Sequence, residues 1–320
     1  MIRVIKPEGF GNIQLEDVPI PEIESRQVLV RTHTTLISRG SELFRRYIRE
    51  DAVSPTIMGY SLTGTVEKVG RDVTEYDIGQ RVKVAAPHAQ YAVGDADSTR
   101  GHIVPLPDDV SFEEGTFLLL CSQATAWTAS SGIKKGDTVV ILGQGVVGSL
   151  MMQIMRGYEP ARIITVDALP LRCKISKELG ADIVINASDE DPVESVRRLT
   201  NGKRADVVVD CVGGYAGIDS FEQAQEMVRA KGTIQLVAAY QQAPLPLHSG
   251  KIMHKRLIAG DVTDVPPTQR ALQALEKIRI GEIQPAKMVT HRLPFKQAKE
   301  AFDFLWNTPE EALAVLLKWR

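Results

Sequence analysis

A glycine-rich segment near the middle of the chain limits the possible fold more than any other feature. The apolar run Thr138–Leu142 is typical of a buried strand, and Gly143-Gln144-Gly145-Val146-Val147-Gly148 follows it directly. Here Gly143 permits a tight turn, Gly145 lets backbone amides approach a pyrophosphate, and Gly148 lets helix and strand pack closely. The next helix offers aligned N–H donors to the anion. The segment predicts a dinucleotide site; the alternative is a strand–helix turn that binds no ligand.

A carboxylate at the end of the next predicted strand indicates which dinucleotide binds. Asp167 follows the apolar run Arg162–Val166, where its oxygens can accept hydrogen bonds from both ribose hydroxyls. A 2′-phosphate would meet like charge there, which favours NAD over NADP. Two alternatives stay open, because Asp167 can cap the following helix and Arg172 can pair with a phosphate. The remaining residues assigned to the cofactor site are Arg172, Thr125, Cys211, Val212, Leu236 and Ala238.

The pattern of predicted elements changes near residue 122. Before it, short runs at 27–33, 59–69 and 80–85 are typical of an antiparallel, barrel-like region. After it, strands and helices alternate as far as residue 239. Such alternation needs crossover helices between parallel strands, so it predicts an α/β fold with a doubly wound sheet. The length of 320 residues fits two domains.

Composition excludes several classes of partner. With 38 Lys and Arg against 40 Asp and Glu, the net charge of -2 gives no general attraction to nucleic acid or anionic membranes. Cys121, Cys173 and Cys211 are too scattered for a disulfide framework, which fits a reducing compartment. No signal peptide or membrane-length apolar run is evident. We expect a cytoplasmic protein that binds a small-molecule substrate, with no nucleic acid and no membrane partner.

Motifs in both halves of the chain are similar to those of one enzyme family. Gly59–Gly70 and Asp77–Val82 resemble the G-H-E-x-x-G-x-V-x-x-V-G and G-D-R-V motifs of medium-chain dehydrogenases/reductases of the alcohol dehydrogenase type. The resemblance implies a GroES-like catalytic domain at 1–121 and 262–320, with a Rossmann NAD-binding domain at 122–261 inserted into it. It also implies a homodimer formed through the edge of the Rossmann sheet, with Pro244–Leu257 placed beyond that edge.

The resemblance fails where zinc-dependent members of the family bind their metal. At the positions that match two cysteines and a histidine, this chain has Arg39, Cys121 and Tyr60. A catalytic zinc needs three protein ligands, which one thiolate does not provide. The cysteines of the family's structural zinc lobe are also missing between Val84 and Ile103. The sequence therefore predicts no zinc.

Without zinc, side chains must move the proton of the substrate hydroxyl. The resemblance matches Ser41 to the family's proton-relay hydroxyl and places the phenol of Tyr60 in the same pocket. His88 titrates in a useful range, and Glu42 could orient Tyr60 or bind a substrate hydroxyl. Each has a structural alternative: Ser41 caps the helix 42–49, Tyr60 fills vacated volume, and His88 is a hydrogen-bonded structural histidine.

Two residues are assigned to the substrate site. Arg39 could bind a carboxylate, a phosphate or the cofactor pyrophosphate. Cys121 is the second, and its alternative is that of a buried small hydrophobe. The basic residues Arg45, Arg46 and Arg49 form either a solvated helix face or part of an anionic substrate mouth.

These observations together predict a zinc-independent, NAD-dependent oxidoreductase that interconverts a secondary alcohol and a ketone on a polar or hydroxylated metabolite. The run Ile37–Glu42 and the ending Leu316–Trp319 resemble the bacteriochlorophyllide dehydrogenase-type branch of the family. Two alternatives remain open: a quinone- or enoyl-type NAD(P)H reductase, and a non-catalytic NAD-binding protein. Activity on enones or quinones with NADPH would favour the first alternative.

Overall fold

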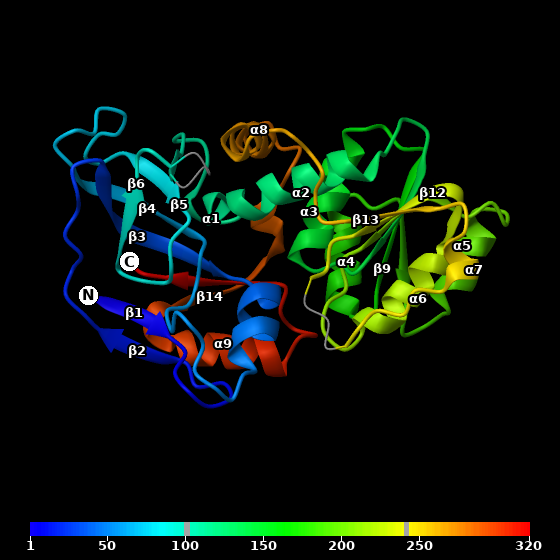
Figure 1. The fold of residues 1–320 in the computed structure, drawn as a ribbon, viewed down its shortest axis with the longest axis horizontal. Helices are drawn as coiled ribbons and strands as arrows, with labels where there is room; N and C mark the ends of the chain where they lie inside the picture. Colours follow the sequence, from blue (N-terminus) through cyan, green and yellow to red (C-terminus); the bar gives the residue numbers. More distant parts are fainter. Residues whose placement is uncertain (99–102, 240–242) are drawn as a thin grey trace. The chain divides into compact units, whose positions relative to one another are not determined.

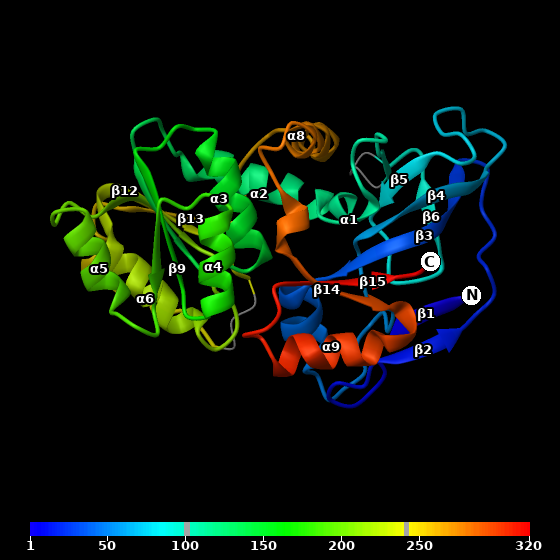
Figure 2. The same ribbon diagram turned by 180° about the vertical axis from the view of Figure 1, so that it is seen from behind.

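The chain forms two compact units. The computed structural model describes residues 1–98, 103–239 and 243–320. Residues 1–122 and 266–320 make up one unit, here called the split unit, and residues 123–265 make up the inserted unit. These divisions lie one and four residues after the expected ones, which were 121/122 and 261/262. Figures 1 and 2 show the elements of each unit from opposite sides.

The inserted unit is built on a six-stranded sheet, in the order β10-β9-β8-β11-β12-β13. Its strands are β8 (Thr138–Leu142), β9 (Arg162–Asp167), β10 (Ile183–Asn186), β11 (Ala205–Asp210), β12 (Val228–Leu236) and β13 (Arg256–Ala259). Every neighbouring pair is parallel. Numbered along the chain, the spatial order is 3-2-1-4-5-6, which is that of a Rossmann sheet. The predicted doubly wound fold is confirmed.

Helices accompany this sheet, and the central strands β8, β9 and β11 are largely buried runs of Val and Ile because both faces are covered. The helices are α2 (Leu118–Ser131), α3 (Val146–Arg156), α4 (Pro170–Glu178), α5 (Pro192–Leu199), α6 (Gly217–Met227) and α7 (Ser249–Ile252). Phe221 and Met227 of α6 share one core with Val140 and Val208 of the sheet.

The edge of this sheet differs from the prediction. The sequence analysis places Pro244–Leu257 beyond the edge, whereas Arg256 and Leu257 lie within the edge strand β13. For these two residues the interpretation was wrong, because β13 has only four residues and its sequence, Arg-Leu-Ile-Ala, does not alternate between polar and apolar side chains.

The split unit contains a seven-stranded sheet, in the order β14-β15-β3-β4-β5-β7, with β6 also paired to β3. Its strands are β3 (Gln27–Ile37), β4 (Leu62–Val69), β5 (Arg81–Val84), β6 (Tyr91–Asp95), β7 (Ile103–Pro105), β14 (Val289–Pro294) and β15 (Ala314–Lys318); β1 (Ile2–Ile5) and β2 (Gln14–Asp17) form a separate pair. All pairings are antiparallel except that of β14 with β15. The C-terminal strand β15 pairs with β3, so the end of the chain completes a sheet begun in its first third.

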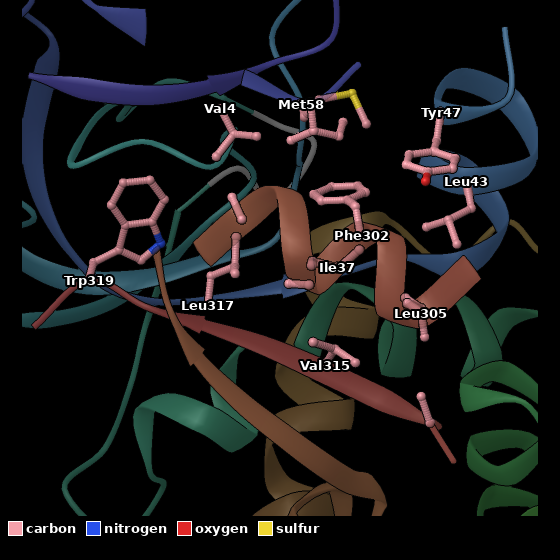
Figure 3. Close-up of a cluster of buried hydrophobic side chains, with 14 residues drawn as sticks. Val4, Ile37, Leu43, Tyr47, Met58, Phe302, Leu305, Val315, Leu317 and Trp319 are labelled. Atoms are coloured by element: carbon pink, nitrogen blue, oxygen red, sulfur yellow. The ribbon is translucent and has the colours of Figure 1, made fainter. Parts of the chain in front are cut away.

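A π-helix, η1 (Arg39–Tyr47), leaves this sheet directly after β3. The other helical elements of the split unit are α1 (Phe112–Gly115), α8 (Pro267–Arg279), α9 (Ala298–Asn307) and the 3₁₀ turns η2 (Pro285–Met288) and η3 (Phe295–Gln297). Figure 3 shows Leu43 and Tyr47 of η1 packed with Phe302 and Leu305 of α9 in one buried cluster. Tyr47 also donates a 2.8 Å hydrogen bond to Asp303. The cluster therefore fixes η1 against the C-terminal segment.

The beginning of η1 differs from the one expected, and its type was not predicted. Ser38 is the N-cap of η1 and Ser41 lies inside it, so the alternative in which Ser41 caps this helix was wrong. The helix expected over 42–49 is a π-helix over 39–47, and π-helical segments are frequent at functional sites. Across the described parts of the chain, no helix combines the length and apolarity needed to cross a bilayer.

Candidate functional site

The glycine turn of the inserted unit has the geometry that a pyrophosphate requires. Gly143 has a φ of +83°, which favours glycine. A Cβ at Gly148 would lie 1.9 Å from the Gly143 carbonyl oxygen, so only glycine lets α3 pack this closely. A Cβ at Gly145 would meet nothing within 4 Å, which leaves open space over the turn. Gly145 is the N-cap of α3 and has no side chain to bond the helix amides, so these amides suit an anion.

Asp167 ends β9 beside this turn. Its Oδ2 accepts a 2.7 Å hydrogen bond from the Gln144 amide, and its Oδ1 accepts a 2.9 Å bond from the Leu169 amide. Leu169 is the N-cap of α4, so Asp167 does not cap this helix and that alternative was wrong. Arg172 of α4 lies 3.8 Å from Oδ2. The buried Nε of Arg172 has no hydrogen-bond partner among the described residues. This N–H group is therefore a donor that a bound ligand could satisfy.

Four other predicted cofactor residues lie at the same ends of neighbouring strands. Cys211 and Val212 directly follow β11, whereas Leu236 ends β12 and Ala238 lies two residues beyond it. Because these strands are parallel to β8 and lie beside it in the order β8-β11-β12, their carboxyl ends lie on the same side of the sheet as the glycine turn. A Cβ at Gly143 would lie 2.8 Å from Val212 Cγ2, so Val212 packs directly on the turn. Thr125, the remaining predicted cofactor residue, belongs to α2.

In the split unit, two hydroxyls predicted to be catalytic lie together. Ser41 Oγ of η1 lies 3.5 Å from Tyr60 Oη, at the long limit of a hydrogen bond. Both side chains are half-buried. Tyr60 is carried by the segment that precedes β4, so two elements distant in sequence bring the hydroxyls together.

His88 and Glu42 form a buried pair in the same unit. His88 Nε2 lies 2.9 Å from Glu42 Oε1, and the Ser38 amide donates a 2.8 Å bond to Glu42 Oε2. Both carboxylate oxygens are thus engaged away from Tyr60. His88 is 0% exposed and Glu42 is 1% exposed, so neither side chain reaches a substrate in this conformation. The structure favours the alternative of a hydrogen-bonded structural histidine.

Gly59 explains how His88 reaches the segment that carries Tyr60. Gly59 has a φ of +96°, and a Cβ there would lie 2.6 Å from the His88 amide nitrogen. The His88 amide also donates to the Met58 carbonyl at 2.8 Å. His88 therefore contacts the Tyr60 segment through its backbone and η1 through its ring. The sequence analysis missed this role of Gly59, because the positive φ is visible only in the structure.

The two residues assigned to the substrate differ in their surroundings. Arg39 Nη1 donates a 2.7 Å bond to the Leu305 carbonyl, and its guanidinium lies 5.7 Å from the ring of Phe44. Phe44 in turn contacts the ring of Trp306. Cys121 is completely buried, and this burial raises the pKa of its thiol. The alternative of a small buried hydrophobe is therefore favoured for Cys121.

The basic residues of η1 and its end also differ from one another. Arg45 and Arg49 are exposed, as on a solvated helix face. Arg46 is half-buried and donates to the carbonyls of Pro55 and Ile57. Arg46 thus supports the backbone of the 55–57 segment.

The side chains at the family's zinc-ligand positions do not suit a zinc ion. The Arg39 guanidinium offers no lone pair, and Tyr60 is a phenol rather than an imidazole. A zinc ligand cysteine must be a thiolate, whereas burial of Cys121 favours its neutral thiol. Within the ranges that the structure describes, no group of three or more His, Cys, Asp or Glu side chains is arranged to hold a metal ion.

Comparisons with known proteins match both units. Residues 24–116 match the family model of the alcohol dehydrogenase GroES-like domain, and residues 146–265 match that of the zinc-binding dehydrogenases. Human sorbitol dehydrogenase is 26% identical over 92% of this chain and 90% of its own length. An alcohol dehydrogenase from Cupriavidus necator is 25% identical over 96% of both chains. The structure of a Thermus alcohol dehydrogenase superposes with a TM-score of 0.83 and 24% identity over 100% of both chains.

Proposed function

Because the chain belongs to the medium-chain dehydrogenase/reductase superfamily, we propose that it is an NAD-dependent, zinc-independent oxidoreductase. Its reaction interconverts a secondary alcohol and a ketone on a polar or hydroxylated small metabolite. The observation that carries the proposal is the glycine turn of the inserted unit with Asp167 at its side. The Ser41 and Tyr60 hydroxyls of the split unit support it separately.

The inserted unit holds the cofactor in this proposal. The amides of the turn Gly143–Gly148 bind the pyrophosphate, and the Asp167 carboxylate binds the adenosine ribose hydroxyls. Bound nicotinamide supplies or accepts a hydride. The Asp167 charge disfavours a 2′-phosphate, which supports NAD over NADP.

The split unit supplies the proton chemistry. Oxidation of an alcohol releases the hydroxyl proton, and reduction of a ketone returns it to the oxygen. In oxidation the Tyr60 oxygen, in its ionised form, accepts this proton, and in reduction the neutral Tyr60 hydroxyl returns it. The Ser41 hydroxyl, 3.5 Å away, donates a hydrogen bond to the substrate oxygen as charge develops there. We assign His88 and Glu42 to the positioning of these hydroxyls, since both are buried.

The relatives support an alcohol or polyol as the substrate, because they include sorbitol and alcohol dehydrogenases. Arg39 adds a cationic group two residues from Ser41, which suits a substrate rich in oxygen atoms. Cys121 stays in the proposed site only as a packing residue.

We further propose that two copies of the chain associate through the edge of the inserted sheet. Apolar side chains gather on or near β13: Leu257 is 40% exposed, Met253 62% and Val262 69%. Unpaired strand edges readily pair with a second copy. Light scattering coupled to size-exclusion chromatography measures the mass of the particle in solution. We expect a dimer for the wild type and a monomer for Leu257→Lys. A monomeric wild type would contradict the proposal.

The central experiment is a substrate screen with the purified protein and NAD. Polyols, cyclitols, sugar acids and simple secondary alcohols are offered, and the nicotinamide absorbance is followed. We expect turnover of at least one hydroxylated compound. Turnover of enones or quinones with NADPH, together with none of alcohols, would contradict the proposal. Metal analysis is the second readout, and one tightly bound zinc per chain would contradict zinc independence.

A further inference from the structure

A buried chain of polar side chains links the glycine turn to the next strand and helix. Ser176 Oγ of α4 lies 3.2 Å from Gln144 Oε1 and 2.8 Å from Thr165 Oγ1 of β9. Gln144 Nε2 lies 3.2 Å from the Gly143 carbonyl oxygen. Gln144, Ser176 and Thr165 are each 0% exposed. No water is therefore needed to satisfy this chain.

The chemistry of each group sets the direction of these hydrogen bonds. Gln144 Oε1 only accepts, so the Ser176 hydroxyl must donate to it. Ser176 has then used its proton, so its oxygen accepts from Thr165 at 2.8 Å. This contact is shorter than the 3.4 Å from Thr165 Oγ1 to the Ile183 carbonyl oxygen, the other acceptor for the same proton. Gln144 Nε2 only donates, which fits the carbonyls of Gly143 and Ile141 in front of it. The side-chain hydrogen bonds therefore all point the same way, from Thr165 of β9 through Ser176 of α4 to Gln144 in the turn.

These three side chains connect the elements that carry the proposed adenosine contacts, which are the glycine turn, β9 and α4. Gln144 also uses its backbone amide to hold Asp167 at 2.7 Å. Arg172, whose buried Nε has no partner among the described residues, lies on α4 one turn before Ser176. Asp167 is therefore held by the Gln144 backbone, and α4, which carries Arg172, is held to the turn by the side chains of Gln144 and Ser176.

The network has no evident necessity for the fold itself. Replacing both partners of a buried hydrogen bond by apolar groups of the same shape is nearly neutral for stability. What apolar packing does not supply is the fixed direction of the bonds, which holds α4 in one register against the turn. Rigid placement of contacts before binding raises affinity because less freedom is lost on binding.

We propose that Gln144, Ser176 and Thr165 form a positioning chain that presets the turn, Asp167 and Arg172 for the adenosine diphosphate half of the dinucleotide. This inference rests on the proposed function. The positioning chain acts on the ground-state affinity of the cofactor and leaves the Asp167 charge in place.

The test measures the Kd of NADH and of ADP-ribose for the full-length protein by calorimetry. Ser176→Ala breaks the positioning chain at its centre, and we expect both ligands to bind roughly fivefold more weakly, as for the loss of about one hydrogen bond. Thr165→Val removes only the outer hydroxyl at nearly constant volume, with a loss of about twofold. The Thr165 variant keeps the test informative if Ser176→Ala does not fold.

The matched control is Ser131→Ala. Ser131 is also 0% exposed, and its hydroxyl donates a 2.7 Å bond to the Thr128 carbonyl within α2. We expect a similar fall in the thermal midpoint but a Kd equal to that of wild type within the error of replicate titrations. A wild-type Kd in both positioning-chain variants, or an equal loss in Ser131→Ala, would refute the positioning role alone. If the wild type bound neither NADH nor NADPH, the proposed function would fail as well.

Discussion

The Nε2 atom of His88 lies 2.9 Å from the Oε1 atom of Glu42, and both side chains are closed off from solvent. Glu42 belongs to the π-helix that carries Ser41, whereas the His88 backbone is bonded to the segment that carries Tyr60. The pair therefore connects the two elements whose hydroxyls lie 3.5 Å apart. A substitution in this pair should therefore alter the relative positions of the Ser41 and Tyr60 hydroxyls, although neither hydroxyl is itself replaced.

Glu42→Gln tests this connection. A carboxylate offers an acceptor oxygen to both His88 and the Ser38 amide, whereas a glutamine amide offers only one. One buried contact is lost, so we expect the free energy of unfolding to fall by about 1–3 kcal/mol. We also expect kcat/KM to fall while the Kd of NADH stays constant. Glu300→Gln, at an exposed position in α9, is the control that should change neither quantity. Unchanged kcat/KM in a folded Glu42→Gln protein would contradict the positioning role.

Tyr60→Phe removes the phenolic hydroxyl and keeps the ring. If this hydroxyl moves the substrate proton, kcat should fall by a factor of roughly 10² or more. Binding of NADH should not change, since the cofactor residues lie in the other unit. Steady-state kinetics on the best substrate of the screen and a calorimetric Kd separate these effects. An unchanged turnover rate would remove Tyr60 from the mechanism.

Asp167→Ser should reverse the cofactor preference. The substitution removes the charge that repels a 2′-phosphate and frees Arg172, now 3.8 Å from the carboxylate, to pair with that phosphate. We expect NADH to bind roughly tenfold more weakly and NADPH more tightly, a change of about 1.4 kcal/mol or more in their difference. Asp189→Asn removes a nearby exposed charge and should leave the ratio unchanged. Tighter binding of NADPH than NADH by the wild type would overturn the NAD assignment itself.

Lys83 of β5 gives a prediction about stability and pH. Burial lowers the pKa of this lysine from 10.5 to about 8. The unfolded chain therefore binds more protons than the folded chain between about pH 8 and 10.5, so stability rises with pH across that window. Below it, burial of the charge costs about 3 kcal/mol.

Lys83→Met removes this cost. We expect denaturant unfolding to show a more stable variant at pH 7, with the difference shrinking as the pH rises toward 10. Lys68→Met, at an exposed position of β4, should show no such pH dependence. A Lys83 variant less stable than wild type at pH 7 would show that the ammonium makes favourable contacts.

Much of the fold follows from local sequence patterns. The glycine turn and the alternating apolar runs predicted the Rossmann sheet, because strand burial and turn geometry leave direct marks on residue type. Strand β13 left no such mark, since its four residues lie at an exposed edge. The π-helix at 39–47 was expected only as a helix over 42–49, because its type depends on backbone hydrogen bonds that the sequence pattern does not show.

The site divides in the same way. The sequence by itself determined the residue types: glycines at the turn, an acid after β9, and Arg39 and Tyr60 where the family has zinc ligands. Only the tertiary structure decided which of these groups meet. It buried His88 against Glu42, closed Cys121 off from solvent and joined Gln144 to Ser176, 32 residues away. Burial and hydrogen-bond partners depend on packing between distant segments, and no local pattern encodes that packing.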